Sequence, residues 1–204
     1  MKIISCMKID EEILRSFGAE TKTYQKKEII FKEEESPLYY YQIISGKVKE
    51  NNYDEDGKEF IQNILGDGQS FGDFSMFIQK KYPINAVCLE PCIILKLPRK
   101  NFAELLRIHP SISVQMNACL SQRLYYKVIM MKSLASQNPA KRLYGLMEYL
   151  KSFQDCEDSF SFPVELTRQQ IADLTGLRVE TVIRTIKKMA NDNLLQIINR
   201  RILY

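Results

Sequence analysis

This sequence of 204 residues lacks the histidine and cysteine patterns that several kinds of functional site require. It has one histidine, His109, and its five cysteines include no CxxC pair. These counts leave no histidine cluster for a metal ion and no catalytic triad with more than one imidazole. An odd number of cysteines without the spacing of a small disulfide scaffold favours reduced thiols. We therefore expect no metal site, and the sequence gives no support to an enzyme.

Long apolar runs are also missing. No stretch approaches the roughly 18 apolar residues of a membrane helix. The first residues, MKIISCMKIDEEIL, reach acidic side chains at 10–12 before an apolar core of a signal peptide can form. We therefore expect a cytoplasmic protein without membrane contact. Its 26% charged and 45% hydrophobic composition is typical of globular chains, and its length favours two domains over one.

Residues 25–98 have the pattern of strands. Short runs rich in β-branched and aromatic residues alternate with turn signals at Ser45-Gly46 and Asp56-Gly57. Five of the eight glycines fall in this stretch, as expected where tight hairpins need positive φ. We predict an all-β unit, a roll or a barrel. The strand-like runs are EIIF (28–31), LYYYQIISG (38–46), KVKENNY (47–53), EFIQNIL (59–65), NAVCLE (85–90) and CIILKL (92–97).

Helical spacing begins after residue 98. RKNFAELLRIHP (99–110) predicts a short helix that Pro110 ends, and a much longer helix follows. Apolar residues recur on this longer helix every three or four positions. Such a stripe predicts contact with the β unit and with a second copy of the helix, while an intramolecular core helix is the alternative. The expected dimer contacts are Met116, Leu120, Leu124, Val128 and Met131.

Pro139 marks a hinge. It disfavours helical geometry at Asn138 and can occupy the first turn of the next helix, AKRLYGLMEYLKSF (140–153). We therefore divide the chain into a β domain (1–109), a long helix expected to form a dimer (110–137) and a C-terminal domain (138–204).

The stretch LTRQQIADLTGLRVETVIRTI (166–186) predicts two helices joined by a tight turn. Thr167 and Gln170 form a capping box for the first helix, and Gly176 supplies the turn. The second helix is expected over 179–191, with a buried face at Val182, Ile186 and Met189. This order of features is typical of a helix-turn-helix, in which the second helix enters the major groove of DNA.

The surface of this region is rich in positive charge. From Glu165 onward the chain has seven basic residues and four acidic ones. This excess is what a phosphate-binding surface requires, and a solvated helical face is the alternative. NDNLLQIINRRILY (191–204) predicts a hairpin whose turn at Asn199-Arg200 forms a wing against the DNA backbone.

Taken together, these features resemble the superfamily of bacterial transcription factors named after the cyclic-AMP receptor protein and the fumarate-nitrate regulator (Crp/Fnr). The resemblance rests on residues 38–77, on the long central helix and on residues 166–195, and it covers nearly the whole chain. It implies an α+β protein with an N-terminal β-roll of the cyclic-nucleotide-binding type, a dimerisation helix and a C-terminal winged helix-turn-helix. It also implies a homodimer that binds double-stranded DNA and works with RNA polymerase.

The resemblance assigns base contacts to the second helix. In this family a Glu and an Arg four residues later read a G·C pair, and Glu180 and Arg184 occupy those positions. Val179 replaces the arginine of cyclic-AMP regulators, and Ile183 replaces a serine common in the fumarate-nitrate branch. We expect TGA-like half-sites in a near-palindromic operator, with Ile183 near a thymine methyl group.

Phosphate contacts are expected around the same helices. The first residues of the helix-turn-helix match family positions that hold phosphates, and Arg178 replaces the usual Ser or Thr cap. Such contacts position a protein without reading sequence. The expected set is Thr167, Arg168, Gln169, Arg178, Lys187, Lys188 and Arg200.

The expected effector is not cyclic AMP. The stretch FGDFSMF keeps Gly72 and places Asp73 at the family's Glu, but the Arg-Ser pair that clamps the cyclic phosphate is Pro83-Ile84 here. Lys127 and Val128 replace the Thr-Ser pair that meets the adenine. An iron-sulfur cluster is not expected either, because Cys6 is the one cysteine near the N-terminus.

Other effector chemistries stay open. Haem could bind through His109 or a cysteine, although a capping role suits this histidine better, and Cys88 and Cys92 are either a redox pair or buried structural thiols. A pocket in the sensor either takes an unidentified small molecule or is filled by its own side chains. The alternative function is a ligand- or redox-sensing interaction module whose helix-turn-helix serves protein contacts. The candidate pocket residues are Phe71, Gly72, Asp73, Phe74, Pro83, Ile84, Tyr126 and Lys127.

Overall fold

The computed structural model describes residues 8–152 and 160–204. The chain divides into two compact units, one within Cys6–Leu120 and one within Ser121–Tyr204, and the division falls inside the long helix α4 (Pro110–Leu134). The predicted domain limit at 109/110 lies at the start of α4, and that at 137/138 lies between α4 and α5. In the described part of the chain, no helix is both long and apolar enough to cross a membrane.

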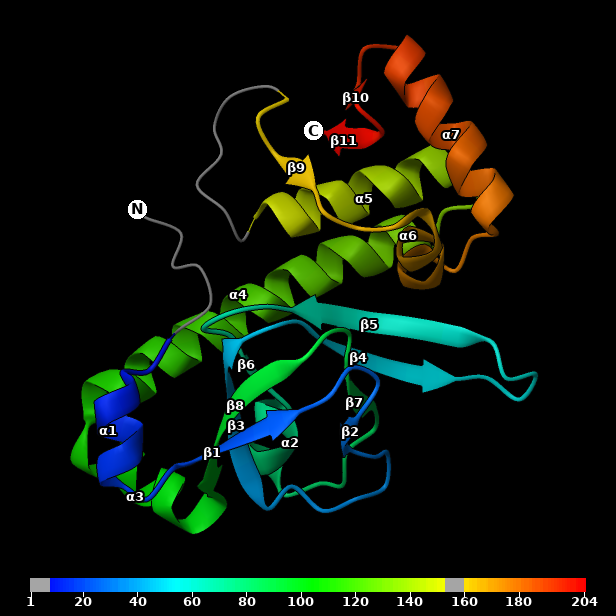
Figure 1. The fold of residues 1–204 in the computed structure, drawn as a ribbon. Coiled ribbons are helices and arrows are strands. Elements are labelled where there is room, and N and C mark those ends of the chain that lie inside the picture. The colour runs from blue at the N-terminus through cyan, green and yellow to red at the C-terminus, as the bar shows by residue number, and fades with distance from the viewer. Residues whose placement is uncertain (1–7, 153–159) are drawn as a thin grey trace. The chain divides into compact units, whose positions relative to one another are not determined.

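The N-terminal unit is a β-roll (Figure 1). Before α4 it contains α1 (Glu11–Ser16), β1 (Glu20–Tyr24), β2 (Ile29–Phe31), β3 (Tyr39–Ser45), β4 (Val48–Tyr53), β5 (Glu59–Leu65), β6 (Ser70–Phe71), α2 (Asp73–Ile78), β7 (Asn85–Cys88), β8 (Cys92–Pro98) and α3 (Arg99–Ile108). Two four-stranded antiparallel sheets form the roll, in the orders β1-β8-β3-β6 and β2-β7-β4-β5. The predicted all-β unit is confirmed, although β1, β6, α1 and α2 were not predicted.

Two cores hold this unit together, because strands β3 and β8 bury side chains on both faces. Tyr41, Ile43 and Ile94 point into the space between the sheets, where they meet residues of β4, β5 and β7. Tyr40 and Leu97 face the other way and pack with α1, α3 and the first turns of α4. Period-two alternation along a strand produces this division.

The first turns of α4 belong to the second of these cores. Ile112, Met116 and Cys119 are buried there, and Leu120 is half-buried against the same cluster. Met116 is therefore a core residue of the roll, which corrects its predicted role as a dimer contact. Further along α4 the stripe changes character, since Leu124, Val128 and Met131 are 65%, 57% and 67% exposed.

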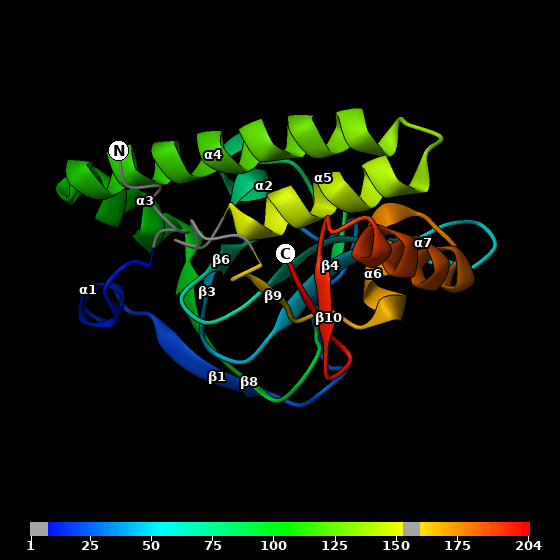
Figure 2. The ribbon, with the colours of Figure 1, turned by 90° about the horizontal axis from the view of Figure 1, so that it is seen from above.

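The C-terminal unit follows the hinge. Its elements after α4 are α5 (Pro139–Lys151), β9 (Pro163–Val164), α6 (Arg168–Thr175), α7 (Val179–Asn191), β10 (Gln196–Ile198) and β11 (Arg201–Leu203). As predicted, Pro139 opens α5. Asn138 caps this helix and accepts a hydrogen bond from the Ala140 N–H at 2.9 Å. Figure 2 shows α5 running back beside the last turns of α4.

Close packing joins these two helices. A Cβ placed on Gly145 would lie 2.3 Å from Ser133 Oγ and 2.4 Å from Ser133 Cβ, so only glycine permits the crossing without a clash. On its other side α5 contributes Leu143, Leu146 and Met147 to a buried core with the inner faces of α6 and α7. The hairpin β10-β11 pairs with β9 and buries Ile202.

Candidate nucleic-acid interface

The turn between α6 and α7 is held by local contacts. The Thr167 hydroxyl accepts a hydrogen bond from the Gln170 N–H (3.1 Å), and the Gln170 side chain accepts one from the Thr167 N–H (2.8 Å). Gly176 ends α6 at φ +66°, a left-handed conformation that favours glycine. The predicted capping box and turn glycine are both confirmed, and so is the predicted span of α7.

Helix α7 has one buried and one open face. Val182, Ile186 and Met189 are at most 2% exposed, which anchors the helix against α5 and α6. Glu180 and Arg184 lie on the open face, and neither takes part in a hydrogen bond or ion pair with a described residue. Ile183, between them, is 39% exposed. The first half of α7 therefore presents an acceptor, a donor and an apolar contact to solvent.

The wing begins where α7 and its following turn end. Asn199 and Arg200 have φ values of +49° and +66°, the geometry of a two-residue hairpin turn. The Arg168 guanidinium lies 3.5 Å from the Arg200 carbonyl oxygen, to which it donates a hydrogen bond. Partial burial lowers the pKa of Arg168, whereas the Arg200 side chain is exposed. The first turn of α6 and the tip of the wing are thus linked.

The other predicted phosphate contacts differ in whether their side chains already have a hydrogen-bond partner. Gln169 donates a hydrogen bond from its amide to Asp173 at 2.8 Å, so that its donor has a partner within α6. Arg178, at the N-cap of α7, makes no capping hydrogen bond with its side chain and is exposed. Lys187 and Lys188 are exposed on α7. Their roles in phosphate binding stay predictions.

Two structural contacts of this unit were not anticipated from the sequence. Arg142 donates hydrogen bonds to the carbonyl oxygens of Ser136 (2.7 Å) and Thr175 (3.3 Å), which ties the hinge to the end of α6. Tyr204 donates a hydrogen bond to the carboxylate of Glu148, and burial, followed by this contact, raises the pKa of Tyr204. The contacts of Arg142 with Thr175 and of Tyr204 with Glu148 join residues 33 and 56 positions apart, so no local pattern reveals them.

The turn of the sensor that resembles a phosphate-binding turn is occupied by the protein itself. The Gly72 N–H donates a hydrogen bond to Glu50 Oε1 at 3.1 Å, and Asp73 accepts one from the Ser70 hydroxyl at 2.7 Å. Glu50 and Asp73 are 6% and 1% exposed. A cyclic phosphate at this turn would meet two buried carboxylates and would compete for the backbone donor.

Aromatic rings fill the space beside this turn. A Cβ on Gly72 would lie 2.9 Å from a ring carbon of Phe31 and 3.0 Å from one of Tyr82. These two rings stack with centroids 3.7 Å apart. Burial, followed by the nearby carboxylates of Asp73, Glu35 and Glu50, raises the pKa of Tyr82.

The candidate pocket residues have different surroundings. Phe71 and Ile84 are buried in the core between the sheets, Phe74 packs on that core, and Pro83 is exposed. At this turn the structure favours a site filled by its own side chains over an open pocket. Tyr126 and Lys127 belong to the C-terminal unit, and their role as effector contacts stays a prediction.

The two cysteines and the histidine considered as sensor groups are packed against other parts of the protein. Cys88 and Cys92 are buried free thiols. Burial raises the pKa of both, that of Cys88 to about 12, so neither is a reactive thiolate at neutral pH. His109 ends α3, and its ring packs edge-on against Phe17 at 5.8 Å. Cys6 lies outside the described residues. The described residues contain no group of three or more His, Cys, Asp or Glu side chains arranged to hold a metal ion.

Comparison with known proteins agrees with this architecture. The chain matches the family model of the cyclic nucleotide-binding domain over residues 21–109 and that of the Crp-like helix-turn-helix domain over residues 140–204. The cAMP-activated global transcriptional regulator CRP of Haemophilus influenzae is 30% identical over 165 residues, which is 80% of this chain and 73% of that protein. The global nitrogen regulator of a Nostoc species is 25% identical over 191 residues, 92% of this chain and 86% of that protein.

Solved structures show the same fold. FixK2 from Bradyrhizobium japonicum has a TM-score of 0.74 at 21% identity and covers 91% of each chain. A CooA variant from Carboxydothermus hydrogenoformans has a TM-score of 0.77 at 19% identity and covers 100% of this chain and 90% of its own. With the β-roll, the long helix and the winged helix-turn-helix in place, the two family matches and the 30% identical relative show that this chain belongs to the Crp/Fnr superfamily of transcription regulators.

Proposed function

We propose that this regulator acts in the cytoplasm as a homodimer that binds a near-palindromic DNA site through the first turns of two α7 helices. The observation that carries the proposal is the open face of α7, where Glu180 and Arg184 are exposed and have no partner among the described residues. A C2 dimer would set the two helices about 34 Å apart, one turn of DNA. RNA polymerase is the partner through which such a bound dimer would act.

The chemistry of this face suits a G·C pair. Arg184 can donate two hydrogen bonds to guanine O6 and N7, and Glu180 can accept one from cytosine N4. The exposed part of Ile183 offers an apolar surface to a thymine methyl group. These three contacts support TGA-like half-sites. Arg178, Lys187, Lys188 and Arg200 surround them with positive charge for the phosphate backbone.

The dimer proposal rests on the second half of α4. Leu124, Val128 and Met131 are spaced on one helical face and are more than half exposed, which is costly for a lone helix in water. Pairing this stripe with the same stripe of a second copy would bury it.

We also propose that the effector, if the regulator uses one, is not cyclic AMP. The buried carboxylate of Glu50 would repel a cyclic phosphate, and the Gly72 N–H already donates to it. Cyclic AMP in large excess should therefore leave the melting temperature unchanged, since a ligand raises it only by binding the folded state. A saturable increase would overturn this part of the proposal.

The proposed base contacts are tested by comparing Arg184→Ala with Lys188→Ala, which removes a different basic residue from the same helix. Fluorescence anisotropy would be measured on a duplex with inverted TTGA-type half-sites and on a scrambled duplex. Arg184→Ala should cost about 1–3 kcal/mol on the specific duplex and little on the scrambled one. Lys188→Ala should weaken both equally and reduce the salt slope by about one. An Arg184→Ala protein that keeps full sequence preference would favour a helix-turn-helix used for protein contacts.

A further inference from the structure

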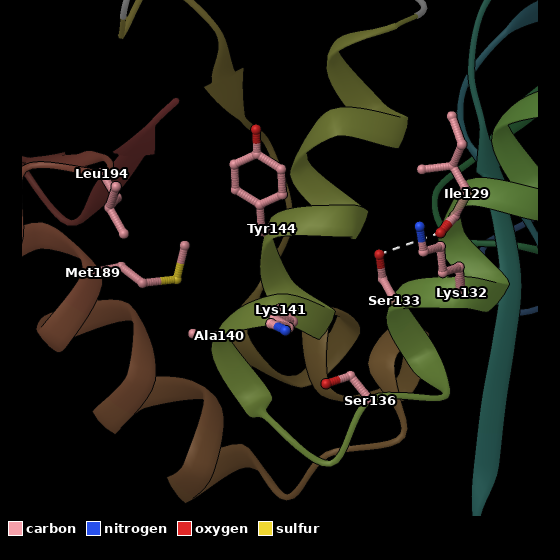
Figure 3. Close-up of a pocket in the computed structure, with 9 residues that line it drawn as sticks. All are labelled: Ile129, Lys132, Ser133, Ser136, Ala140, Lys141, Tyr144, Met189 and Leu194. Atoms are coloured by element: carbon pink, nitrogen blue, oxygen red, sulfur yellow. Dashed lines mark hydrogen bonds between the residues drawn. The ribbon is translucent and has the colours of Figure 1, made fainter.

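A cavity of about 540 Å³ lies in the C-terminal unit, between the last turns of α4, the start of α5 and the end of α7. Figure 3 shows Met189 and Leu194 on one side of it and Ile129 on the other, with Tyr144 of α5 between them. Its volume is in the range of small-molecule sites, about 300–1,000 Å³. The cavity is separate from the open face of α7, because Met189 belongs to the buried face of that helix.

The wall of this cavity is mainly apolar and reaches solvent. Tyr144 and Leu194 are each 49% exposed, while Met189, which also lines the cavity, is 2% exposed. Tyr144 is held in place by an edge contact to Tyr204, with ring centroids 5.9 Å apart. A hollow of this kind exposes apolar surface to water, and an apolar ligand group would remove it from water.

Two lysines give the cavity its charge. Lys132 from α4 and Lys141 from α5 line it, both are exposed, and neither has an ion-pair partner among the described residues. Lys141 stands in the first turn of α5, which contains no acidic residue. A helix N-terminus disfavours positive charge. A basic residue at this unfavourable position, in a cavity that a second unpaired lysine also lines, indicates that an anion completes the site.

We propose that this cavity binds an amphipathic carboxylate, a small molecule with an alkyl or aryl tail. The tail packs on Ile129, Tyr144 and Leu194, and the carboxylate pairs with Lys132 and Lys141. Ser133 and Ser136 also line the cavity. The Ser133 hydroxyl already donates a hydrogen bond to the Ile129 carbonyl oxygen at 3.2 Å, as Figure 3 shows, so charge pairing with the lysines carries the anion preference.

The position of the cavity gives such a ligand a means of control. It would contact α4 before the hinge at 135–138 and α5 and α7 after it, and so it would bias the hinge toward the geometry that it binds best. This consequence for DNA rests on the proposed function. The binding itself does not, and it is measured without DNA.

Decanoate is the probe, used on the full chain below its micelle concentration. The sequence has no tryptophan, so Tyr144→Trp provides a single reporter in the cavity wall. We expect a saturable blue shift of its emission with one site per chain. In the same background, Ala140→Leu should abolish the shift by filling the cavity. Ala135→Leu is the matched control, because Ala135 is exposed in the same hinge and does not line the cavity.

Charge is tested separately. Lys132→Gln with Lys141→Gln should weaken decanoate binding about tenfold, whereas Lys80→Gln with Lys100→Gln, at exposed positions of the β-roll, should not change it. Isothermal titration of the protein without the reporter substitution should give the same affinity.

Several results would overturn the proposal. An unsaturable shift, or an equal shift in the Ala140→Leu protein, would mean detergent-like association only. Equal affinity for 1-decanol would remove the carboxylate from the assignment. A response to an acidic amphipathic peptide but not to decanoate would make the cavity a protein-docking site. A changed sedimentation coefficient in the Ala140→Leu protein would make it a subunit contact. If decanoate binds and DNA does not, the cavity assignment stands and the proposed function fails.

Discussion

Buried ionisable side chains set the pH response of the β-roll at the scale of single residues. Burial raises the pKa of Cys88 from 9.0 to about 12 and that of Tyr24 from 10.0 to about 12. Each group therefore holds its proton more tightly in the folded protein than in the unfolded chain. The stability that this provides is complete below the unfolded pKa and is lost as pH rises through the folded pKa.

The free energy of unfolding should therefore fall between about pH 9 and pH 12. Urea unfolding at a series of pH values in this window measures the slope. Cys88→Ala should have a shallower fall, because it removes one of the buried groups whose pKa is raised, although its stability at neutral pH is lower. A wild-type stability that is flat or rises across the window would contradict the burial of these groups.

Single residues also mark where sequence reasoning stopped. Glu180 and Arg184 could be placed on an open helical face because the period of α7 and its caps lie within a few residues of them. Glu50 could not be linked to Gly72, 22 positions away, nor Arg142 to Thr175, 33 positions away. Contacts across such separations depend on how strands and helices pack, and one sequence carries no local sign of them.

At the scale of elements, the crossing of α4 and α5 depends on Gly145. Alanine is normally preferred to glycine in a helix by about 0.5–1 kcal/mol. Here a Cβ would clash with the Ser133 side chain, so the two helices would have to separate. Steric packing therefore outweighs helix propensity at this position.

Gly145→Ala should lower the free energy of unfolding by about 1–3 kcal/mol. Ser133→Gly in the same chain should restore part of the loss, because it removes the side chain that the new methyl group meets. Gly66→Ala is the matched control, since no heavy atom lies within 4 Å of its added Cβ. The measurement is chemical unfolding of the three proteins. A Gly145→Ala protein more stable than the wild type would show that the helices do not cross this closely.

Element prediction succeeded where periodicity was strong. The span of α7 and the hinge at Pro139 follow from caps and apolar spacing that are read locally. Strand β1 was missed because four of its five residues are exposed at the edge of a sheet and lack an apolar pattern. Strand β6 has two residues, too few for any period. The stripe on α4 was visible, but its spacing could not reveal that Met116 faces the β-roll and Leu124 faces solvent.

At the scale of the whole molecule, the exposed apolar stripe of α4 favours association of two chains. The first turns of α4 pack into the core of the β-roll, and the apolar residues further along the helix are exposed. A dimer that covers this stripe would also bring two DNA-binding units together, and the second binding event on DNA would then become intramolecular.

Leu124→Glu should convert the dimer to a monomer in sedimentation velocity. It should also weaken binding to the specific duplex by about 100-fold or more, because avidity is lost. Leu38→Glu is the matched control: Leu38 is 57% exposed, against 65% for Leu124, and lies on the β-roll. An unchanged dimer in the Leu124→Glu protein would place the subunit contact elsewhere.

The most direct test of the central claim is the binding of the purified wild-type protein to DNA. Fluorescence anisotropy across a salt series would compare a duplex carrying inverted TTGA-type half-sites with a scrambled duplex. We predict tighter binding to the first duplex, by a factor of about 1,000 or more, with affinity that falls steeply as salt increases. Equal and weakly salt-dependent binding to both duplexes, in a protein that is folded and dimeric, would contradict the account.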